Sequence, residues 1–295
     1  LHRVDRRQRQ MCIRDSNLSD SYVTLFDAEV HQVYQAEAIL RGTVRTRTGV
    51  NQNTYQWPKL GKGVASVRTP QSDVVPMAAD WANISVTMTD YIAAEYSDIF
   101  QQSHVNFQER QELAQMVGGA IARREDQIVV DAMIAATPGT TVANSVGGSA
   151  TDMNIAKLRT ASAALNAANA PQQDRYLLMH ANALEALLSE TSVTSSDFTA
   201  PGSSPLVKGM IGFYMGFSII MMGDRDEDGL PKDGSNDRSS FAWHKNAVGL
   251  AVSLPQKTAI DYVPEKTSWL VAGHLSAGSG VIDTTGLVEI ISREA

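Results

Sequence analysis

The feature that most constrains this chain is one long amphipathic stretch from Ser103 to Thr137. Its apolar residues recur at the three- and four-residue spacing of a single helical face, while Arg, Glu and Asp side chains fill much of the rest. At about 1.5 Å per residue such a helix spans roughly 50 Å, which is enough to cross a whole domain. The glycines at 118–119 weaken the pattern without overturning it, and the Pro-Gly pair at 138–139 ends it. We therefore predict a spine helix over residues 103–137.

The composition excludes several classes of protein. The 295 residues are 43% hydrophobic and 19% charged, so the chain can bury a core, in two lobes or in one elaborated domain. The formal net charge of -7 argues against a surface built to hold nucleic acid through phosphate contacts. A single cysteine, Cys12, excludes a disulfide framework and a cysteine-based zinc site. The most apolar run, residues 209–223, is too short and too rich in glycine to span a bilayer.

The N-terminal part of the chain divides in two. Residues 1–16 carry five arginines against two aspartates and show neither helical nor strand periodicity. We interpret them as an open-reading-frame artefact or a disordered leader; the alternative is a basic arm that reaches nucleic acid. Residues 17–49 are typical of an N-terminal arm, because apolar residues such as Tyr22 and Phe26 are too few for it to fold alone. Such an arm must pack on a neighbouring element or subunit.

The next stretch, residues 50–82, indicates a long and exposed β-hairpin. Tyr55 and Trp57 fall on one face of its first predicted strand, and glycines and prolines punctuate the residues after that strand. Lys59 and Lys62 lack the spacing of a phosphate-binding loop, so we interpret them as solvated lysines.

A half-buried strand is predicted next, over residues 84–92, because apolar and hydroxyl side chains alternate there. It leads directly into the spine helix. Three further strands are predicted near the C-terminus, and we expect them to pair with this strand and close the first lobe. They cover residues 257–263, 268–275 and 286–292.

Between these parts the sequence predicts a mixed α/β lobe. A link rich in Gly, Ser, Thr and Asn (residues 139–151) marks its start. Short apolar runs then alternate with helical patterns, which favours strands and helices packed in layers. The predicted elements are a helix over 155–165 with Thr151 or Asp152 as its cap, strands over 175–180, 216–223 and 240–244, and a helix over 181–190.

No catalytic motif stands out. His180 and His244 each lie at the end of a predicted buried strand, and we interpret both as structural histidines rather than general bases. Ser103 precedes His104 at the predicted start of the spine helix, where it fits a cap better than a nucleophile.

The sharpest local motif is the acidic run from Asp224 to Gly229. Asp224, Asp226 and Asp228 match the first half of a calcium loop, in which alternate carboxylates face one cation. The second half of the motif fails, because Ser235 occupies the twelfth position in place of a bidentate glutamate. We predict no cofactor, and keep Ca²⁺ binding by these aspartates as an alternative to an acidic, solvated hairpin.

Taken together, these elements resemble the major capsid protein of tailed bacteriophages, the HK97-like fold that encapsulin compartments share. The resemblance covers residues 17–295 and depends on the order of several weak motifs. An arm and an extended loop precede ISVTMTDYIAAEYSD and the spine sequence QERQELAQMVGGAIARREDQIVVDAMI. RYLLMHANALEALLSE, MIGFYMGFSIIMMGD, AWHKNAVGLAV and GVIDTTGLVEIIS then follow in the order typical of the family.

The resemblance implies an α+β fold with a peripheral and an axial domain. The implied parts are an N-arm (17–49), an extended E-loop hairpin (50–82), a peripheral domain that holds the spine helix (83–139 and 257–295) and a mixed α/β axial domain (140–256). It also implies a structural protein without enzyme activity. The residues expected to contact neighbouring subunits are Tyr22, Phe26, Tyr55, Trp57, Lys59 and Lys62.

As a family member, the chain is expected to self-assemble through pentamers and hexamers into an icosahedral head around double-stranded DNA. Expected partners are copies of itself, a separate scaffolding protein, a portal and a decoration protein, with DNA packaged without sequence-specific binding and no membrane. The expected location is the virion capsid, reached by assembly in the host cytoplasm. Two alternatives remain: an encapsulin-like compartment shell, and a calcium-binding module built on Asp224, Asp226 and Asp228.

Overall fold

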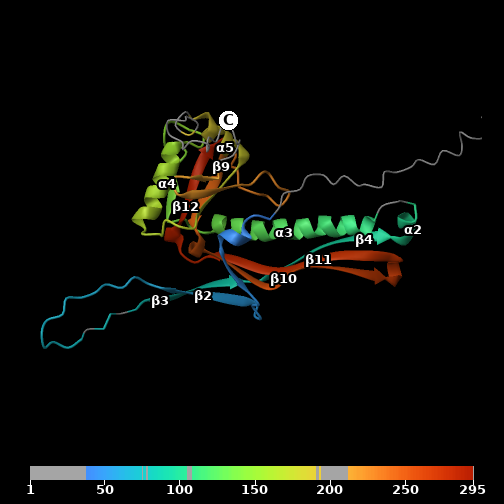
Figure 1. Cartoon of the computed structure of the whole chain (residues 1–295), viewed down its shortest axis with the longest axis horizontal. Coiled ribbons are helices and arrows are strands. Elements are labelled where there is room, and N and C mark those ends of the chain that lie inside the picture. The colour runs from blue at the N-terminus through green and yellow to red at the C-terminus, as the bar shows by residue number, and fades with distance from the viewer. Residues whose placement is uncertain are drawn as a thin grey trace, which may run out of the picture.

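The computed structural model describes residues 38–74, 76–77, 79–104, 108–190, 193 and 212–294. Within these residues a long helix lies along an elongated sheet, a compact lobe sits at one end, and a hairpin projects from beneath that lobe (Figure 1). The predictions for residues 1–16, Tyr22 and Phe26 lie outside the described residues. No helix in the described part is long and apolar enough to cross a membrane.

The predicted spine helix is present as α3, but it is shorter than expected at 27 residues, Glu109–Ala135. A separate short helix, α2 (Ile99–Gln102), comes first. Ser103 does not cap α3, because its hydroxyl donates to the carbonyl of Phe100 (2.6 Å) and closes α2. Glu109 and Glu112 in the first turn complement the helix dipole instead.

The helix lies along a four-stranded sheet of strand order β1-β10-β11-β4. Its strands are β1 (Arg45–Thr48), β10 (Val248–Val263), β11 (Ser268–Val281) and β4 (Thr89–Asp98). The expectation that C-terminal strands pair with the strand ahead of the helix is thus confirmed for β11, which is antiparallel to β4. Gly273 lets α3 approach closely, since a Cβ there would lie 2.8 Å from Val117 and 2.9 Å from Ile121.

The strand predicted over residues 84–92 is in fact two strands. The hairpin strands β2 (Thr54–Leu60) and β3 (Trp81–Thr87) pair antiparallel, and β4 begins at Thr89 in the other sheet. The break falls at Met88, whose N–H donates to the carbonyl of Asn53 (2.8 Å). The hairpin therefore extends beyond residue 82, because the alternation that marks a strand continues unchanged across a change of partner.

The compact lobe holds a six-stranded mixed sheet of order β5-β12-β9-β6-β8-β7. Its strands are β5 (Thr140–Val142), β12 (Leu287–Arg293), β9 (Asp237–His244), β6 (Arg175–Met179), β8 (Phe217–Met221) and β7 (Phe213–Tyr214). Helices α4 (Ile155–Ala167) and α5 (Ala181–Ser189) complete the predicted α/β lobe. The 3₁₀ turns of the described part are η2 (Arg41–Thr43), η3 (Lys245–Ala247), η4 (Pro264–Lys266) and η5 (Thr284–Gly286).

Two expectations for this lobe were wrong. Strand β12 was expected to close the first lobe, but it pairs with β9 and β5 in the six-stranded sheet. The cap of α4 is Asn154, whose side chain accepts the N–H of Lys157 (2.9 Å), and not Thr151 or Asp152. The carbonyls of Thr151 and Asp152 instead accept hydrogen bonds from the Lys157 ammonium group, at 2.6 and 3.0 Å.

The second half of α3 joins the two sheets. Val129, Val130 and Met133 are fully buried in a cluster that also contains Leu250 of the four-stranded sheet and Trp243 of the six-stranded sheet. This shared core fixes the compact lobe to one end of the elongated sheet, as Figure 1 shows.

Candidate functional site

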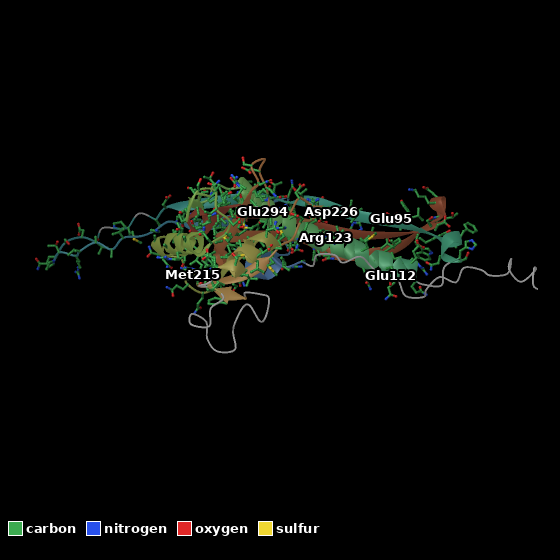
Figure 2. All side chains as sticks on the ribbon, turned by 90° about the horizontal axis from the view of Figure 1, so that it is seen from above. Glu95, Glu112, Arg123, Met215, Asp226 and Glu294 are labelled. Atoms are coloured by element: carbon green, nitrogen blue, oxygen red, sulfur yellow. The ribbon has the colours of Figure 1, made fainter. Side chains whose placement is uncertain are left out.

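The most exposed apolar part of the described structure is the far end of the β2–β3 hairpin. Strand pairing ends at Leu60 and Trp81, and the described residues between them (61–74, 76–77 and 79–80) form no strand. Val64, Val67 and Val74 there are 81%, 97% and 85% exposed. Figure 2 shows this loop far from the body, at the opposite end of the molecule from Glu95 and Glu112. Several exposed apolar side chains on one projecting loop favour a surface that another molecule covers.

The base of the hairpin packs against its own chain. Tyr55 and Trp57 do share one face, as predicted, with their rings edge-on at 4.9 Å. That face turns inward, however, and Trp57 is only 2% exposed, in a cluster with Val86 and Ala251. Trp57 therefore belongs to the core and is removed from the predicted inter-subunit contacts, while Tyr55 is half-buried beside it.

The two hairpin lysines differ. Lys59, predicted to be solvated, forms an ion pair with Asp283 (2.9 Å) and so ties the hairpin to turn η5. Burial acts to raise the pKa of Asp283, but hydrogen bonds from Lys59 and Thr285 outweigh it, and the pKa lies below its ordinary value. Lys62 is exposed in the loop.

The acidic run after β8 is docked on α3 and is not a free hairpin. Arg225 pairs with Asp126 (3.1 Å), and Glu227 pairs with Arg123 (3.0 Å). The backbone of Gly229 forms hydrogen bonds with the side-chain amide of Gln127, at 3.1 and 3.2 Å.

Asp224, Asp226 and Asp228 are not brought together as a set of metal ligands. Asp224 turns to Arg238 (3.0 Å) and His180 (3.4 Å). Within the described residues, no group of three His, Cys, Asp or Glu side chains is arranged to hold a metal ion.

The same segment of α3 also holds the point where the N-terminal arm enters the body. The carboxylate of Asp126 accepts the backbone N–H groups of Ile39 and Leu40, both at 2.9 Å, in addition to its contact with Arg225. Glu125 faces Arg41 at 3.4 Å; burial raises the pKa of Glu125, and Arg41 opposes that shift. Sequence periodicity missed this junction, because Glu125 and Asp126 were assigned to the polar face of α3, yet they are 3% and 1% exposed.

Each of the two histidines caps the element that follows it. The Nδ1 atom of His180 accepts the N–H of Asn182 at the start of α5, and the Nδ1 atom of His244 accepts the N–H of Asn246 at the start of η3. Both contacts measure 3.3 Å. Burial lowers the pKa of His244, which favours its neutral, accepting form.

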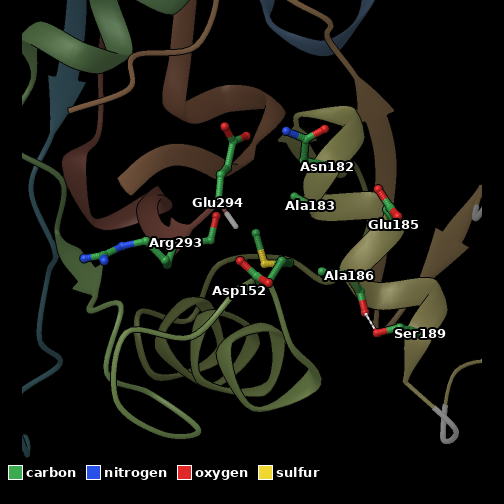
Figure 3. Close-up of a pocket in the computed structure, with 10 residues that line it drawn as sticks. Asp152, Asn182, Ala183, Glu185, Ala186, Ser189, Arg293 and Glu294 are labelled. Carbon is green, nitrogen blue, oxygen red and sulfur yellow. Dashed lines mark hydrogen bonds between the residues drawn. The ribbon is translucent and has the colours of Figure 1, made fainter. Parts of the chain in front are cut away.

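A cavity of about 380 Å³ lies between α5, the end of β12 and the loop before α4 (Figure 3). Asp152, Glu185 and Glu294 lie around it, and the hydroxyl of Ser189 donates to the carbonyl of Ala186. The described residues that line it include no histidine or cysteine.

Comparison with known proteins identifies the family. A family model described as phage capsid protein matches residues 18–294. The chain belongs to this family. Its role is therefore structural, and its place is the capsid of the virion, as predicted from the sequence.

Solved capsids share the fold of this capsid protein. The capsid of the cyanophage P-SCSP1u aligns with a TM-score of 0.75 at 16% identity, over 94% of each chain. The head of the Helicobacter pylori bacteriophage KHP40 gives 0.76 at 12% identity, over 94% of this chain and 96% of that one. The structure from Mycobacterium phage Che8 aligns with a TM-score of 0.70 at 17% identity, over 91% of this chain and 96% of that one. No curated protein matches this chain.

These comparisons confirm the predicted capsid fold and favour a phage capsid over the alternatives. They support neither an encapsulin-like compartment nor a calcium-binding module built on the aspartates at 224, 226 and 228. The exposed loop of the hairpin, residues 61–80, is the candidate functional surface of this capsid protein.

Proposed function

We propose that copies of this capsid protein assemble through pentamers and hexamers into the icosahedral head that encloses the double-stranded DNA of a tailed phage. The observation that carries the proposal is the projecting hairpin, whose loop exposes Val64, Val67 and Val74 almost completely. A family match over residues 18–294 supports it.

The physical argument starts from the free energy of exposed apolar surface. Burying a valine side chain contributes roughly 1.5 kcal/mol or more, so this loop gains most when another copy covers it. A contact between a loop on one copy and a different surface on the next is head-to-tail, and such contacts close into rings when the rotation allows. The hairpin is therefore suited to hold neighbouring subunits of a ring or of adjacent rings.

The lobes take separate places in this scheme. The α/β lobe would surround the symmetry axes, and the elongated sheet with α3 would lie between capsomers. We assign β12 (Leu287–Arg293) to the α/β lobe and β10, from Val248, to the elongated sheet, because each strand pairs there. The N-terminal arm and the hairpin would clamp neighbouring copies.

Assembly also calls for other molecules. We infer a separate scaffolding protein, a portal and a decoration protein as partners, with assembly in the host cytoplasm. The chain carries a net charge of -7, which favours a lining that repels packaged DNA and makes no sequence-specific contacts.

Light scattering and negative-stain imaging of the purified chain, begun at Asn17, test the proposal. We expect closed shells or capsomer rings of uniform size. Val67→Asp should abolish them, because it places a charge in the buried contact, and should leave the melting temperature of the subunit unchanged. Ser66→Asp is the matched control, since it adds the same charge at the adjacent, more polar position. A compact monomer at all concentrations, even with the scaffolding protein added, would contradict the proposal.

A further inference from the structure

The base of the hairpin rests on a patch of sheet that lacks side chains. Gly249 of β10 lies directly opposite Gly280 of β11, and Ala251 lies opposite Gly278 in the same register. None of the three glycines adopts a positive φ. Backbone conformation therefore does not require glycine at these positions, and another reason must be sought.

The space above each glycine is filled by the hairpin. A Cβ at Gly280 would lie 2.6 Å from Cγ2 of Val86, and one at Gly278 would lie 2.9 Å from Cγ1 of the same residue. The Cβ at Gly278 would also collide with the carbonyl oxygen of Thr87. At Gly249 the neighbour is the ring of Trp57, with Cε2 at 2.7 Å. One methyl group of Val86 thus packs against Gly278 and the other against Gly280.

Further contacts hold the hairpin in this position. The ion pair of Lys59 with Asp283 ties one strand to η5, and the guanidinium of Arg45 lies 5.0 Å from the centre of the Trp57 ring. The Nε1 atom of Trp57 is buried and has no hydrogen-bond partner in the part of the chain that the structure describes. Close packing, and not hydrogen bonding of the indole, therefore places this ring.

We propose that Gly249, Gly278 and Gly280 form a seat that fixes the direction in which the hairpin leaves the body. The seat thereby decides which surface of a neighbouring copy the loop at residues 61–80 reaches. The reach of the loop to a neighbouring copy rests on the proposed function, whereas the direction of the hairpin does not. The glycines are positioning residues, because they act on assembly only through the hairpin.

The geometry of the hairpin amplifies any change at the seat. At about 3.3 Å per residue, the far end of the loop lies roughly 50 Å from Val86. A displacement of about 1 Å over a seat roughly 10 Å long tilts the hairpin by about 6°, which moves the far end by about 5 Å. Such a shift is large compared with the tolerance of a well-packed contact.

Spin labels measure this shift directly in the unassembled subunit. One label at Ser66→Cys lies in the loop, and a second at Ala163→Cys lies on the exposed face of α4, in a Cys12→Ser background. Gly280→Ala should change the distance between the labels by about 5 Å. Gly234→Ala is the matched control, because a Cβ there meets nothing within 4 Å, and it should leave the distance unchanged.

A compensating substitution makes the test specific. Among the described residues, only the side chain of Val86 lies within 4 Å of a Cβ at Gly280, so Gly280→Ala combined with Val86→Ala should restore the original distance. If Gly280→Ala does not fold, Val86→Leu and the double variant take its place. Val86→Leu should change the distance between the spin labels, and the double variant should leave that distance unchanged. An unchanged distance in the variant that folds, or a double variant that stays shifted, would overturn the seat.

Imaging of the same variants separates the two claims. Gly280→Ala should alter the size or yield of particles, and the double variant should recover them. A shifted label distance with unchanged particles would leave the seat standing, while it would overturn the role of the hairpin between subunits.

Discussion

Replacement of Asp126 by asparagine should destabilise the subunit more than any other single change of charge in α3. The carboxylate is 1% exposed and accepts hydrogen bonds from the backbone of Ile39, from the backbone of Leu40 and from Arg225. The side chain of Arg225 is itself only 2% exposed. Asparagine keeps the size of the side chain but removes its charge and one acceptor, so the buried guanidinium of Arg225 loses its ion pair with Asp126.

The magnitude follows from this arrangement. Removing one partner of a buried ion pair costs about 3–5 kcal/mol, because the remaining charge stays desolvated. Arg225→Met should cost less, about 1–3 kcal/mol, since Asp126 keeps its two backbone donors. A loss of about 4 kcal/mol lowers the melting temperature by roughly 6–7 °C in a chain of 295 residues.

Thermal unfolding of the unassembled subunit and hydrogen exchange measure the two effects. In Asp126→Asn, the amides of Ile39 and Leu40 should lose protection, because their acceptor is impaired. In Arg225→Met they should keep it. Asp226→Asn is the matched control, since it neutralises an exposed carboxylate in the same loop, and should change the melting temperature by less than about 2 °C. Equal losses in the first two variants, or protected amides in Asp126→Asn, would refute the reasoning.

Three further predictions concern the compact lobe. Burial lowers the pKa of Lys157 to about 8, so between pH 8 and 10 the unfolded chain binds a proton that the folded chain has lost. The free energy of unfolding should therefore rise by up to about 1.4 kcal/mol per pH unit in that range, and Lys157→Met should lack this rise. Parallel pH profiles of stability for the two proteins would contradict the prediction. Asn154→Ala removes the cap of α4 and also the hydrogen bonds that its amide nitrogen donates to Val146 and Thr151, and should cost about 1–2 kcal/mol in urea unfolding. Asn154→Asp keeps only the cap, so its cost should fall below that of alanine by the worth of the cap alone, and equal costs would argue against capping. Calcium should leave the melting temperature unchanged, because Asp224 is held by Arg238 and His180; a rise with calcium that Asp226→Asn abolishes would show a cation site.

Patterns confined to one element could be read from the sequence. The unit of β6 and α5 was predicted within one or two residues, because the strand is one short apolar run and the helix buries one regularly spaced apolar face. The long helix was also predicted, but its start was not. The sequence pattern predicted one helix from Ser103, whereas α2 ends at Gln102 and α3 begins at Glu109. Local propensity does not determine where one helix ends and the next begins.

The predictions that failed depend on partners distant in the sequence. The apolar pattern of β12 is compatible with pairing in either sheet. Its pairing with β9 is determined by packing between distant residues, which no local pattern predicts. The burial of Asp126 depends on Arg225, 99 residues away, and the charged run in α3 gives no sign of it. Trp57 was correctly placed on one face of the hairpin, but no local pattern predicts that this face packs against a sheet lined with glycine. The glycines at 249, 278 and 280 were the available signal, since glycine is unfavourable inside a strand without such a reason.

A cryo-electron microscopy reconstruction of the assembled particles tests the central claim most directly. We expect icosahedral shells in which the loop at residues 61–80 lies against a neighbouring copy, with Val64, Val67 and Val74 covered. Shells in which these loops project into solvent without contact would contradict the account, and so would a preparation that never forms shells or rings.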